Sequence, residues 1–374
     1  MNGARYFSPD YSTARERFLS AAKAAGLELE SHPIAARGPG GEELAIDVAT
    51  CGAAEPTRTV VVSSGLHGVE GFLGSACQLR YLEEHLPQRE LPEGLRLVFL
   101  HALNPYGFAW IRRVNERNVD LNRNFLRPGE RYEGAPEGYA ELNGLLNPTR
   151  PPRRLSAFYL RAGATLARQG MAKLKNAVAG GQYDFPLGVF FGGHEPEETQ
   201  RILDEHLARW AGTESAETVY HVDFHSGLGP SATYKLLVDH PSGAPAVDEL
   251  GAAFGSDVVE PWEPSLGVAY EISGGLGTWA QVRFPETRYE VLVAEFGTYP
   301  PIKVLRALHF ENRAHHHGRG PTHSSTRWAK GLLKEAFAPA DHGWRDTVVP
   351  RGVAIVERAL RALESQPQGA GAGA

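Results

Sequence analysis

Cysteine is scarce in this chain of 374 residues, which contains only Cys51 and Cys77. The two stand in dissimilar contexts and do not form the closely spaced pair of a metal-binding motif, so we expect two free thiols rather than a disulfide. The sequence also lacks any apolar run of 18 or more residues, and its first residues lack the apolar core of a signal peptide. We therefore expect no membrane span and a cytoplasmic location.

An excess of positive charge is also missing. The formal net charge is −6 and the sequence pI is about 6.2. Without a global basic field or a basic stripe, the composition argues against nucleic acid and anionic membranes as partners. Hydrophobic residues make up 42% of the chain and charged residues 22%, which is typical of a globular protein that buries a full core.

The first third of the chain alternates between strand-like and helix-like segments. Residues 27–34 and 43–49 predict a hairpin, because Gly38-Pro39-Gly40-Gly41 between them is a strong turn signal. Residues 57–64 are β-branched and apolar, which is typical of a buried central strand. A predicted helix over 71–85 and a predicted strand over 95–101 follow. This order predicts an α/β fold with a sheet covered on both faces.

The rest of the chain predicts further elements without an internal repeat or a clear linker. Helices are expected over residues 11–25, 154–179, 196–210, 301–312 and 353–365, and strands over 217–224, 233–238 and 289–295. Residues 126–153 and 314–350 predict irregular structure, since they are rich in glycine, proline and polar residues. The Gly-Ala tail at the end of the chain is expected to be disordered.

A first candidate site follows the predicted central strand, in Ser63-Ser64-Gly65-Leu66-His67-Gly68-Val69-Glu70. Open α/β sheets place their sites at the carboxyl ends of strands. His67 and Glu70 are three residues apart, so one turn of chain can direct both at one metal, and imidazole and carboxylate are common zinc ligands. By itself such a pair is a weak signal, because a polar loop explains it equally well.

A second candidate site lies in His221-Val222-Asp223-Phe224-His225-Ser226-Gly227, which again ends an apolar, strand-like stretch. His225 at this strand end completes a set of two histidines and one carboxylate, the pattern of catalytic zinc with an open position for water. Asp223 is a candidate to orient a ligand imidazole. His225 considered alone would be interpreted as a buried core histidine.

Two further segments add polar chemistry. Residues 113–125 interleave arginines with asparagine and aspartate and have little apolar periodicity, so they suit a donor array for a carboxylate and an oxyanion. Glu295 ends an apolar strand-like stretch and is a candidate general base, because an apolar environment raises the pKa of a carboxyl group. The simpler interpretations are a solvated Arg/Asn loop and a surface carboxylate at a strand end.

Taken together, these segments resemble the zinc carboxypeptidase family (the M14 metallopeptidases), and within it a poorly characterised bacterial branch. His67 and Glu70 followed much later by His225 match the zinc-binding pattern of the family, and residues 120–124 match its Asp-x-Asn-Arg-Asn run. The resemblance covers about residues 58–300. It implies a three-layer α/β sandwich with a mixed sheet of roughly eight strands, and one Zn²⁺ per chain.

The resemblance also implies roles for individual residues. Asn122 and Arg123 would hold a carboxylate of the substrate, and Arg113, in an Arg-x-Asn setting, would polarise the scissile carbonyl. Glu295 would be the catalytic glutamate. Tyr270, in Tyr270-Glu271-Ile272-Ser273-Gly274-Gly275, resembles the tyrosine of the capping loop of the family. The position that sets pocket chemistry falls near Gly277, so the sequence leaves the side-chain preference open.

The chain also departs from the classical members. The 154 residues between Glu70 and His225 exceed the classical spacing, and we assign the excess to a helical insertion at 154–211. We expect a catalytic domain over 1–313, with residues 314–374 packing on the same domain as a C-terminal extension that is disordered from about residue 367. The histidines of the extension, His315-His316-His317 with His323, suggest a second metal site, or more simply an exposed polar loop.

Three interpretations of function stay open at this point. The first is a zinc hydrolase that cleaves an amide bond in a small peptide-like substrate bearing a free carboxylate. The second is an N-acyl amino acid deacylase of the aspartoacylase or succinylglutamate desuccinylase type, which shares the zinc motifs; the Ser-Gly-Gly loop and the lack of a β-rich C-terminal pattern favour the first. The third is a non-catalytic metal-binding scaffold. The sequence does not determine the oligomeric state.

Overall fold

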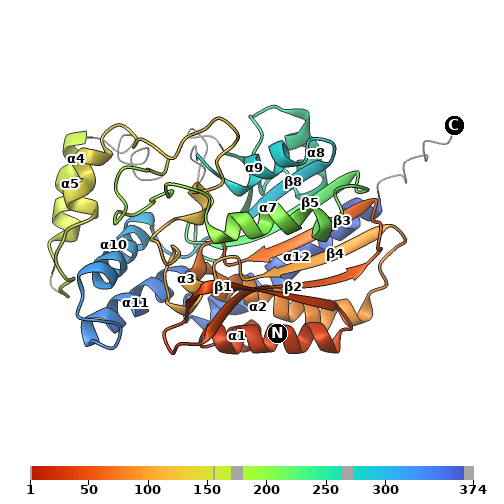
Figure 1. The fold of residues 1–374 in the computed structure, drawn as a ribbon, viewed down its shortest axis with the longest axis horizontal. Helices are drawn as coiled ribbons and strands as arrows, with labels where there is room; N and C mark the ends of the chain where they lie inside the picture. Colours follow the sequence, from red (N-terminus) through yellow and green to blue (C-terminus); the bar gives the residue numbers. More distant parts are fainter. Residues whose placement is uncertain (1, 155, 170–179, 263–272, 366–374) are drawn as a thin grey trace.

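A computed structural model describes residues 2–154, 156–169, 180–262 and 273–365. Its centre is one eight-stranded mixed sheet in the order β1-β2-β4-β3-β5-β8-β6-β7 (Figure 1). The strands are β1 (Glu28–Arg37), β2 (Glu43–Gly52), β3 (Arg58–Ser64), β4 (Leu95–His101), β5 (Thr218–Ser226), β6 (Tyr234–Val238), β7 (Val259–Pro261) and β8 (Arg288–Phe296). The mixed, roughly eight-stranded sheet expected from the sequence is confirmed.

Parallel pairing at the centre of the sheet follows from the apolar strands. β4, β3, β5 and β8 run parallel to one another, and every residue of β3 and β5 is buried. A strand that is apolar on both sides needs cover on both faces, as parallel sheets provide. The hairpin expected over 27–49 is present as the antiparallel pair of β1 and β2. The antiparallel strands thus lie toward the edges of the sheet.

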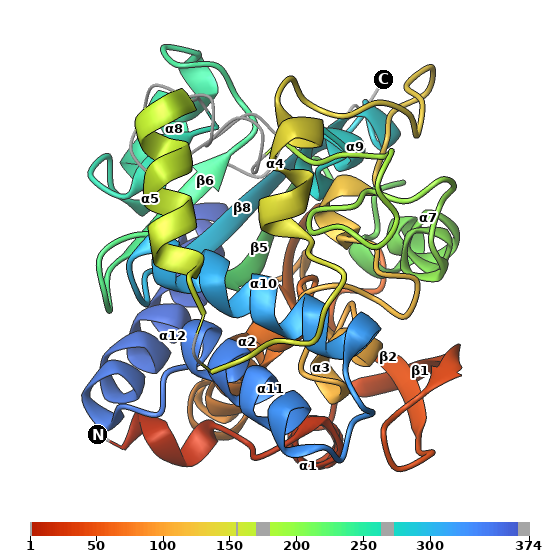
Figure 2. The ribbon, with the colours of Figure 1, turned by 90° about the vertical axis from the view of Figure 1, so that its left-hand side faces the viewer.

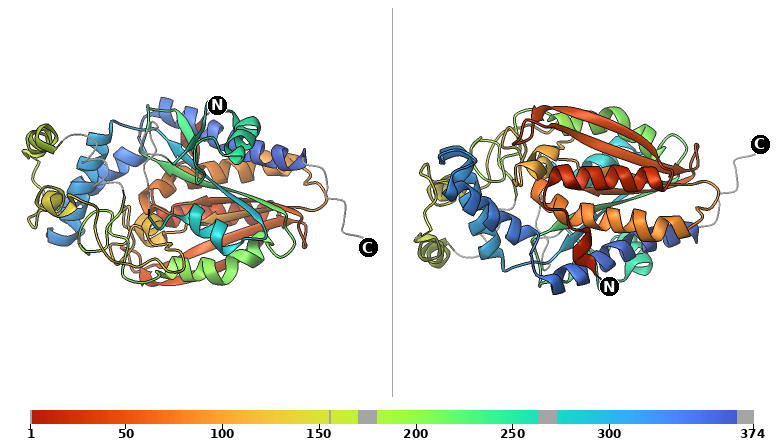
Figure 3. Two further views of the ribbon diagram at one scale, coloured as in Figure 1. Left: turned by 90° about the horizontal axis from the view of Figure 1, so that it is seen from above. Right: turned by 90° about the horizontal axis from the view of Figure 1, so that it is seen from below.

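Helices cover both faces of the sheet, so the fold has three layers with the sheet in the middle (Figures 1 and 3). The helices are α1 (Tyr11–Ala24), α2 (Gly71–Arg80), α3 (Pro105–Ala109), α4 (Tyr139–Leu146), α5 (Phe158–Gln169), α7 (Glu198–Ala211), α8 (Pro245–Phe254), α9 (Leu276–Arg283), α10 (Pro301–His317), α11 (Ser324–Phe337) and α12 (His342–Glu364). Side chains of α1, α2, α8 and α12 form one core with the sheet, and side chains of α7 and α9 form the core on the other face.

A third core lies at one end of the sheet. Side chains of α4, α10 and α11 pack there with α3 and with the turn that follows β3. Figure 2 looks onto this end, where α10 and α11 lie in front of the sheet. The carboxyl end of β3 therefore opens toward a region that helices enclose. None of the described helices is both long and apolar enough to cross a membrane.

Two predictions of irregular structure were wrong. Residues 139–146 form α4, and most of 314–350 is helical because α10 continues to His317, α11 spans Ser324–Phe337 and α12 begins at His342. The histidine run therefore lies on the last turn of α10 and is partly buried, not in an exposed loop. Pro350 lies inside α12, and the apolar face of this helix is nevertheless buried. Tertiary burial outweighed the local signals for a break.

Other predicted elements agree to within a few residues, except that the helix expected over 353–365 is the second half of α12, which begins at His342. The helix expected over 154–179 begins at Phe158, and residues 170–179 lie outside the described part of the chain. Within the described residues α10 runs across the expected boundary at residue 313, so no change of secondary structure marks it. The residues after 365, where we expect disorder, also lie outside the description. Cys51 and Cys77 are free thiols, as predicted.

Candidate metal centre

The turn after β3 holds His67 and Glu70 in place. His67 precedes a short 3₁₀ helix, Gly68–Glu70, at the start of α2. The backbone N–H groups of Gly68 and Val69 donate hydrogen bonds to the carbonyls of Arg113 and Arg112, at 3.1 and 2.8 Å. These bonds tie the turn to the arginine-rich segment. Both side chains are buried, and the turn directs them to the same point.

Gly68 has no room for a side chain, because an added Cβ would lie 2.1 Å from the backbone carbon of Gly107. We expect Gly68→Ala to lower the free energy of unfolding by about 1–3 kcal/mol, since backbone atoms must shift to relieve the overlap. Urea denaturation measures the change. Gly331→Ala, in α11 with no atom within 4 Å of the added Cβ, is the control and is expected to be neutral or stabilising. An equal effect at both positions would contradict this account of the turn.

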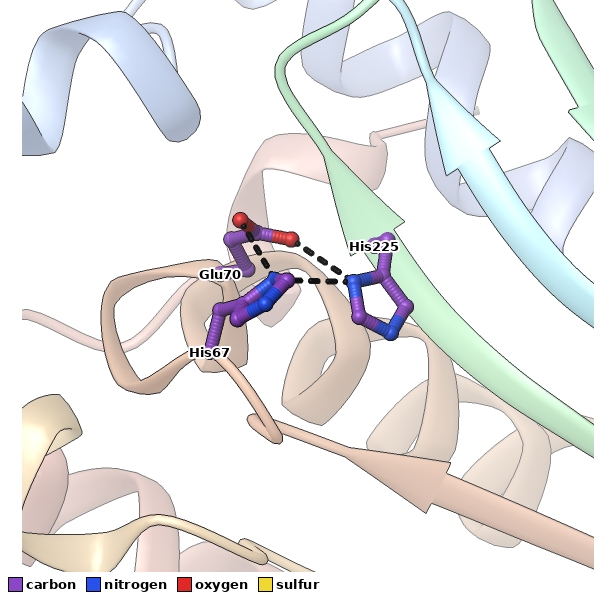
Figure 4. Close-up of side chains that lie close together, drawn as sticks. All are labelled: His67, Glu70 and His225. Carbon is purple, nitrogen blue, oxygen red and sulfur yellow. Dashed lines mark hydrogen bonds and ion pairs between the residues drawn. The ribbon is translucent and has the colours of Figure 1, made fainter. Parts of the chain in front are cut away.

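His225 comes to the same point from a strand beside β3. His225 is the next-to-last residue of β5, two residues after Asp223, and its side chain is buried. The Nδ1 atoms of His225 and His67 are 3.0 Å apart, and the Glu70 carboxylate lies 3.1 Å from Nδ1 of His67 and 3.2 Å from Nδ1 of His225 (Figure 4). One possible ligand atom from each of the three residues lies within 4.8 Å of those of the other two. The expected ligand set is thus assembled.

Each histidine is held from behind by a carboxylate. Nε2 of His225 lies 2.6 Å from Asp223, and Nε2 of His67 lies 3.1 Å from Asp120. A hydrogen on Nε2 of His225 is therefore shared with Asp223, which leaves Nδ1 as the atom of this ring that can bind a metal. Lone pairs on two Nδ1 atoms that meet at 3.0 Å would repel each other unless a proton or a cation lies between them. This arrangement matches the carboxylate–histidine–metal chains of known metal sites.

The charges at this point are strongly coupled. Burial lowers the pKa of His225, but the carboxylates of Asp223 and Glu70 outweigh burial and hold that pKa well above its usual value. Burial raises the pKa of Glu70, and the two histidines outweigh it and hold that pKa below its usual value. Glu70 therefore stays ionised and attracts positive charge into a buried place, as a metal ligand must.

Glu295 stands beside the ligands on the neighbouring strand. In the pairing of β5 with β8 it is the direct partner of His225. Its Oε1 accepts a hydrogen bond of 2.8 Å from the backbone N–H of Leu228, which fixes the carboxyl group. Burial, followed by the nearby charge of Glu70, raises the pKa of Glu295 to about 8. A carboxyl group with a pKa in this range can both accept and return a proton near neutral pH.

Arg113 also reaches the ligands. Its guanidinium donates to Asp120 at 2.9 Å and to Glu70 at 3.0 Å, and a third nitrogen lies 2.7 Å from Nε2 of His67. The sequence analysis did not predict that Asp120 binds both Arg113 and His67. Its place as the first residue of the Asp-x-Asn-Arg-Asn run could have indicated a role at the site. Arg113 is therefore a cation next to His67 and Glu70 and is itself held in place by Asp120.

Asn122 and Arg123 lie on the same side of the sheet, in the turn that packs against α9. The side-chain oxygen of Asn122 accepts a hydrogen bond of 3.1 Å from the backbone N–H of Leu276, and Arg123 is buried. Gly274 approaches the carbonyl of Arg123, where an added Cβ would lie 2.4 Å away. These contacts join the segment to the loop that precedes α9. Tyr270, expected in that loop, lies outside the described residues.

Among the residues that the structure describes, the other histidines do not form a second metal-binding group. His101 is buried, lies 3.0 Å from Ser75 and stacks on Phe18, as a core histidine does. His315 and His316 lie next to a buried ion network in which Glu311 pairs with Arg112 and Lys330. Across the ranges that the structure describes, no group of three metal-binding side chains occurs besides that of His67, Glu70 and His225.

Comparison with solved structures shows the fold. Bovine thrombin-activatable fibrinolysis inhibitor, solved in complex with a tick carboxypeptidase inhibitor, is similar over 97% of this chain and 100% of its own, with 13% identity and a TM-score of 0.53. Carboxypeptidase A from Helicoverpa armigera is similar over 96% of this chain and 74% of its own, with 13% identity and a TM-score of 0.48. At this identity the likeness concerns the fold.

Comparison of sequences gives the family. No curated protein matches the chain. One family model matches residues 7–351, and its description is protein of unknown function, DUF2817. The match spans nearly all of the described chain, from before α1 into α12. The protein therefore belongs to the DUF2817 family, and its fold is that of the zinc carboxypeptidases.

Proposed function

We propose that this chain is a zinc-dependent hydrolase that cleaves an amide bond next to a free carboxylate, in the manner of a carboxypeptidase. The observation that carries the proposal is the convergence of His67, Glu70 and His225 on one buried point, with Glu295 directly beside it. The fold supports the proposal, because bovine thrombin-activatable fibrinolysis inhibitor, solved in complex with a carboxypeptidase inhibitor, has a similar fold.

The donor set fits zinc. Two imidazole nitrogens and one carboxylate are the ligands of many catalytic zinc sites, and such a set leaves a position open. The Nδ1 atoms of the two histidines and the ionised carboxylate of Glu70 face one another and would supply the donors, and Arg113 is bound to Glu70 beside them. When bound, a zinc ion would act as a Lewis acid and lower the pKa of a water molecule. The same ligands accept other divalent ions, and metal analysis of the purified protein distinguishes them.

The residues around the ligands would divide the remaining work. Glu295 would accept a proton from the attacking water and return it to the leaving amine, a transfer that its raised pKa favours. Arg113, held by Asp120, would donate hydrogen bonds to the oxyanion that forms on the scissile carbonyl. Asn122 and Arg123 would hold the carboxylate of the substrate, so that its binding orients the scissile bond.

The alternative function, an N-acyl amino acid deacylase, would use the same zinc ligands and differs from the peptidase in its substrate. A deacylase of this type was expected to have a β-rich C-terminal domain. In the described residues after 313, by contrast, the chain forms the end of α10, then α11 and α12. The helical C-terminal part supports the peptidase, and a substrate screen decides between the two.

The experiment that tests the proposal combines metal content with turnover. Plasma mass spectrometry of the purified protein is expected to give about one zinc per chain. The protein should release C-terminal amino acids from short blocked peptides, lose this activity with a chelator, and regain it on addition of zinc. N-acyl amino acids are screened in parallel. A protein that neither contains nor binds zinc would overturn the proposal and leave a non-catalytic scaffold.

The carboxylate behind His225 gives a graded test of the same site. We expect Asp223→Asn to weaken zinc binding by about 10- to 100-fold, because the amide no longer fixes the tautomer and basicity of the imidazole. Competition with a chromophoric chelator measures the affinity. Thr59→Ser, on β3 but bonded to the carbonyl of Ala211 away from the ligands, is the control. An unchanged affinity in Asp223→Asn would contradict the assignment of His225 as a ligand.

A further inference from the structure

Four polar side chains lie in a row inside the apolar sheet, behind the metal centre. They are Ser63 of β3, His221 and Asp223 of β5, and Tyr289 of β8, and all four are buried. On each strand they alternate with a valine of the core under α7 and α9, so they share that face of the sheet. A buried polar group is costly unless it is hydrogen-bonded. We call these four residues the polar row.

Hydrogen bonds join the polar row into one continuous path. The hydroxyl of Tyr289 lies 3.1 Å from Nδ1 of His221, and Nε2 of His221 lies 2.8 Å from Oγ of Ser63. The hydroxyl of Ser63 donates to Oδ1 of Asp223 at 2.6 Å, and Oδ2 of Asp223 lies 2.6 Å from Nε2 of His225. Nδ1 of His225 faces the other two metal ligands (Figure 4). The path therefore leads from the interior of the sheet to the metal centre.

The hydrogens of the polar row all point toward Asp223. A carboxylate only accepts, so Ser63 gives its single hydrogen to Asp223, and its oxygen accepts from Nε2 of His221. Burial lowers the pKa of His221 to about 4, although Asp223 opposes it, so near neutral pH the ring is neutral and its Nδ1 accepts. Burial raises the pKa of Tyr289, so its hydroxyl keeps its hydrogen and donates it to Nδ1. Each donor thus has an acceptor, in one direction.

The pairing of strands fixes Ser63 beside Asp223. The two are direct partners in the parallel pairing of β3 with β5, the strands whose residues are all buried. Ser63 holds one oxygen of the carboxylate and leaves the other to His225. Without the hydroxyl, Asp223 would lose the bond that sets its rotation and would keep a buried oxygen without this donor. The orientation of the imidazole would then be less well defined.

We propose that Ser63 is a positioning residue of the metal centre, which acts through Asp223 to hold the imidazole of His225 in the orientation that binds zinc, and that His221 and Tyr289 extend this support. The inference rests on the function proposed above and adds residues to the same site. Partners behind a metal ligand set its orientation and basicity. An imidazole that is already oriented loses less freedom when the metal binds, so the affinity is higher.

Removal of one hydroxyl tests the proposal. We expect Ser63→Ala to weaken zinc binding by about 10-fold, measured by competition with a chromophoric chelator. Ser64→Ala is the matched control, because Ser64 is the next residue of β3, is equally buried and donates to Gln78 at 2.9 Å on the opposite face. It should keep the affinity of the wild type. Tyr289→Phe removes the far donor and keeps the ring, and it should weaken zinc binding less than Ser63→Ala does.

Stability separates positioning from a general weakening of the fold. Both serine variants lose one buried hydrogen bond, so urea denaturation of the metal-free proteins should show similar losses, while zinc affinity falls only in Ser63→Ala. At saturating zinc this variant should regain most of its activity. An affinity equal to that of the wild type, or equal losses of affinity in both serine variants, would overturn the inference while the hydrolase stands. If Ser63→Ala does not fold, Tyr289→Phe decides in its place, and an unchanged affinity there would overturn the inference.

NMR of the imidazole nitrogens gives a readout that needs neither zinc nor turnover. In the metal-free wild type His221 is expected to carry its hydrogen on Nε2 and none on Nδ1. A hydrogen on Nδ1 alone would reverse the direction of the polar row and would overturn the inference. A wild type that binds no zinc would overturn the proposed function and this inference with it, so the two failures are distinguished by the zinc affinity of the wild type.

Discussion

Glu295→Gln is expected to lower kcat by about 10²- to 10⁴-fold while the protein keeps its zinc and its fold. Glutamine has nearly the same shape as glutamate, and its side-chain oxygen can still accept the hydrogen bond from Leu228. It cannot take a proton from water, however, and cannot return one to the leaving amine. Because Glu295 is a neighbour of the ligands and is not in the set of three that converges, metal content should not change. Kinetics on the best peptide and metal analysis of the same sample measure both effects.

Glu290→Gln is the matched control for this experiment. It lies on the same strand, five residues earlier, and its carboxylate binds His240 and Arg288 instead of facing the metal ligands. We expect it to keep kcat within a small factor. If Glu295→Gln were as active as the wild type, the general base would have to be another group. If it lost its zinc as well, the drop in kcat would report the metal site and not proton transfer.

His225→Ala is expected to reduce the zinc content from about one per chain to nearly none. The substitution removes one of three donors, and it leaves Glu70 and Asp223 as buried carboxylates without their shared imidazole. Activity should fall with the metal. A bound metal stabilises the folded chain, by about 4 kcal/mol at a free concentration of 1,000 times Kd. Addition of zinc should therefore raise the melting temperature of the wild type and leave that of the variant unchanged.

His309→Ala separates loss of a ligand from loss of a buried histidine. His309 is buried on α10, and its ring lies 2.9 Å from the carbonyl of Leu146, away from the metal ligands. We expect this variant to lose some stability and to keep its zinc and its response to added zinc. Full zinc content in His225→Ala would sink the assignment of the centre. Loss of zinc in both variants would instead point to a general weakness of the fold.

The strands of the sheet were predictable from the sequence because their patterns are local. Residues 58–64 are rich in β-branched side chains and residues 95–101 are mostly apolar, and they form β3 and β4 with nearly the expected bounds. Helices were also expected over 301–312 and 353–365 and are present within α10 and α12, but the helical structure of most of residues 314–350 was not predictable in this way. The helices of this region contain glycine, histidine and Pro350, and they form because each buries an apolar face against the rest of the protein. That gain depends on partners far away in the chain, which a local pattern does not show.

The sequence by itself determined which residues could bind a metal, because His67, Glu70 and His225 follow glycine-rich turns or end apolar strands. The tertiary structure decided which groups surround them. Asp120 came to His67 and Glu295 came beside His225, across separations of 53 and 70 residues. The physical reason is that charge and hydrogen bonding act over a few ångströms in space. Only the pairing of strands and the packing of helices bring such groups within that range.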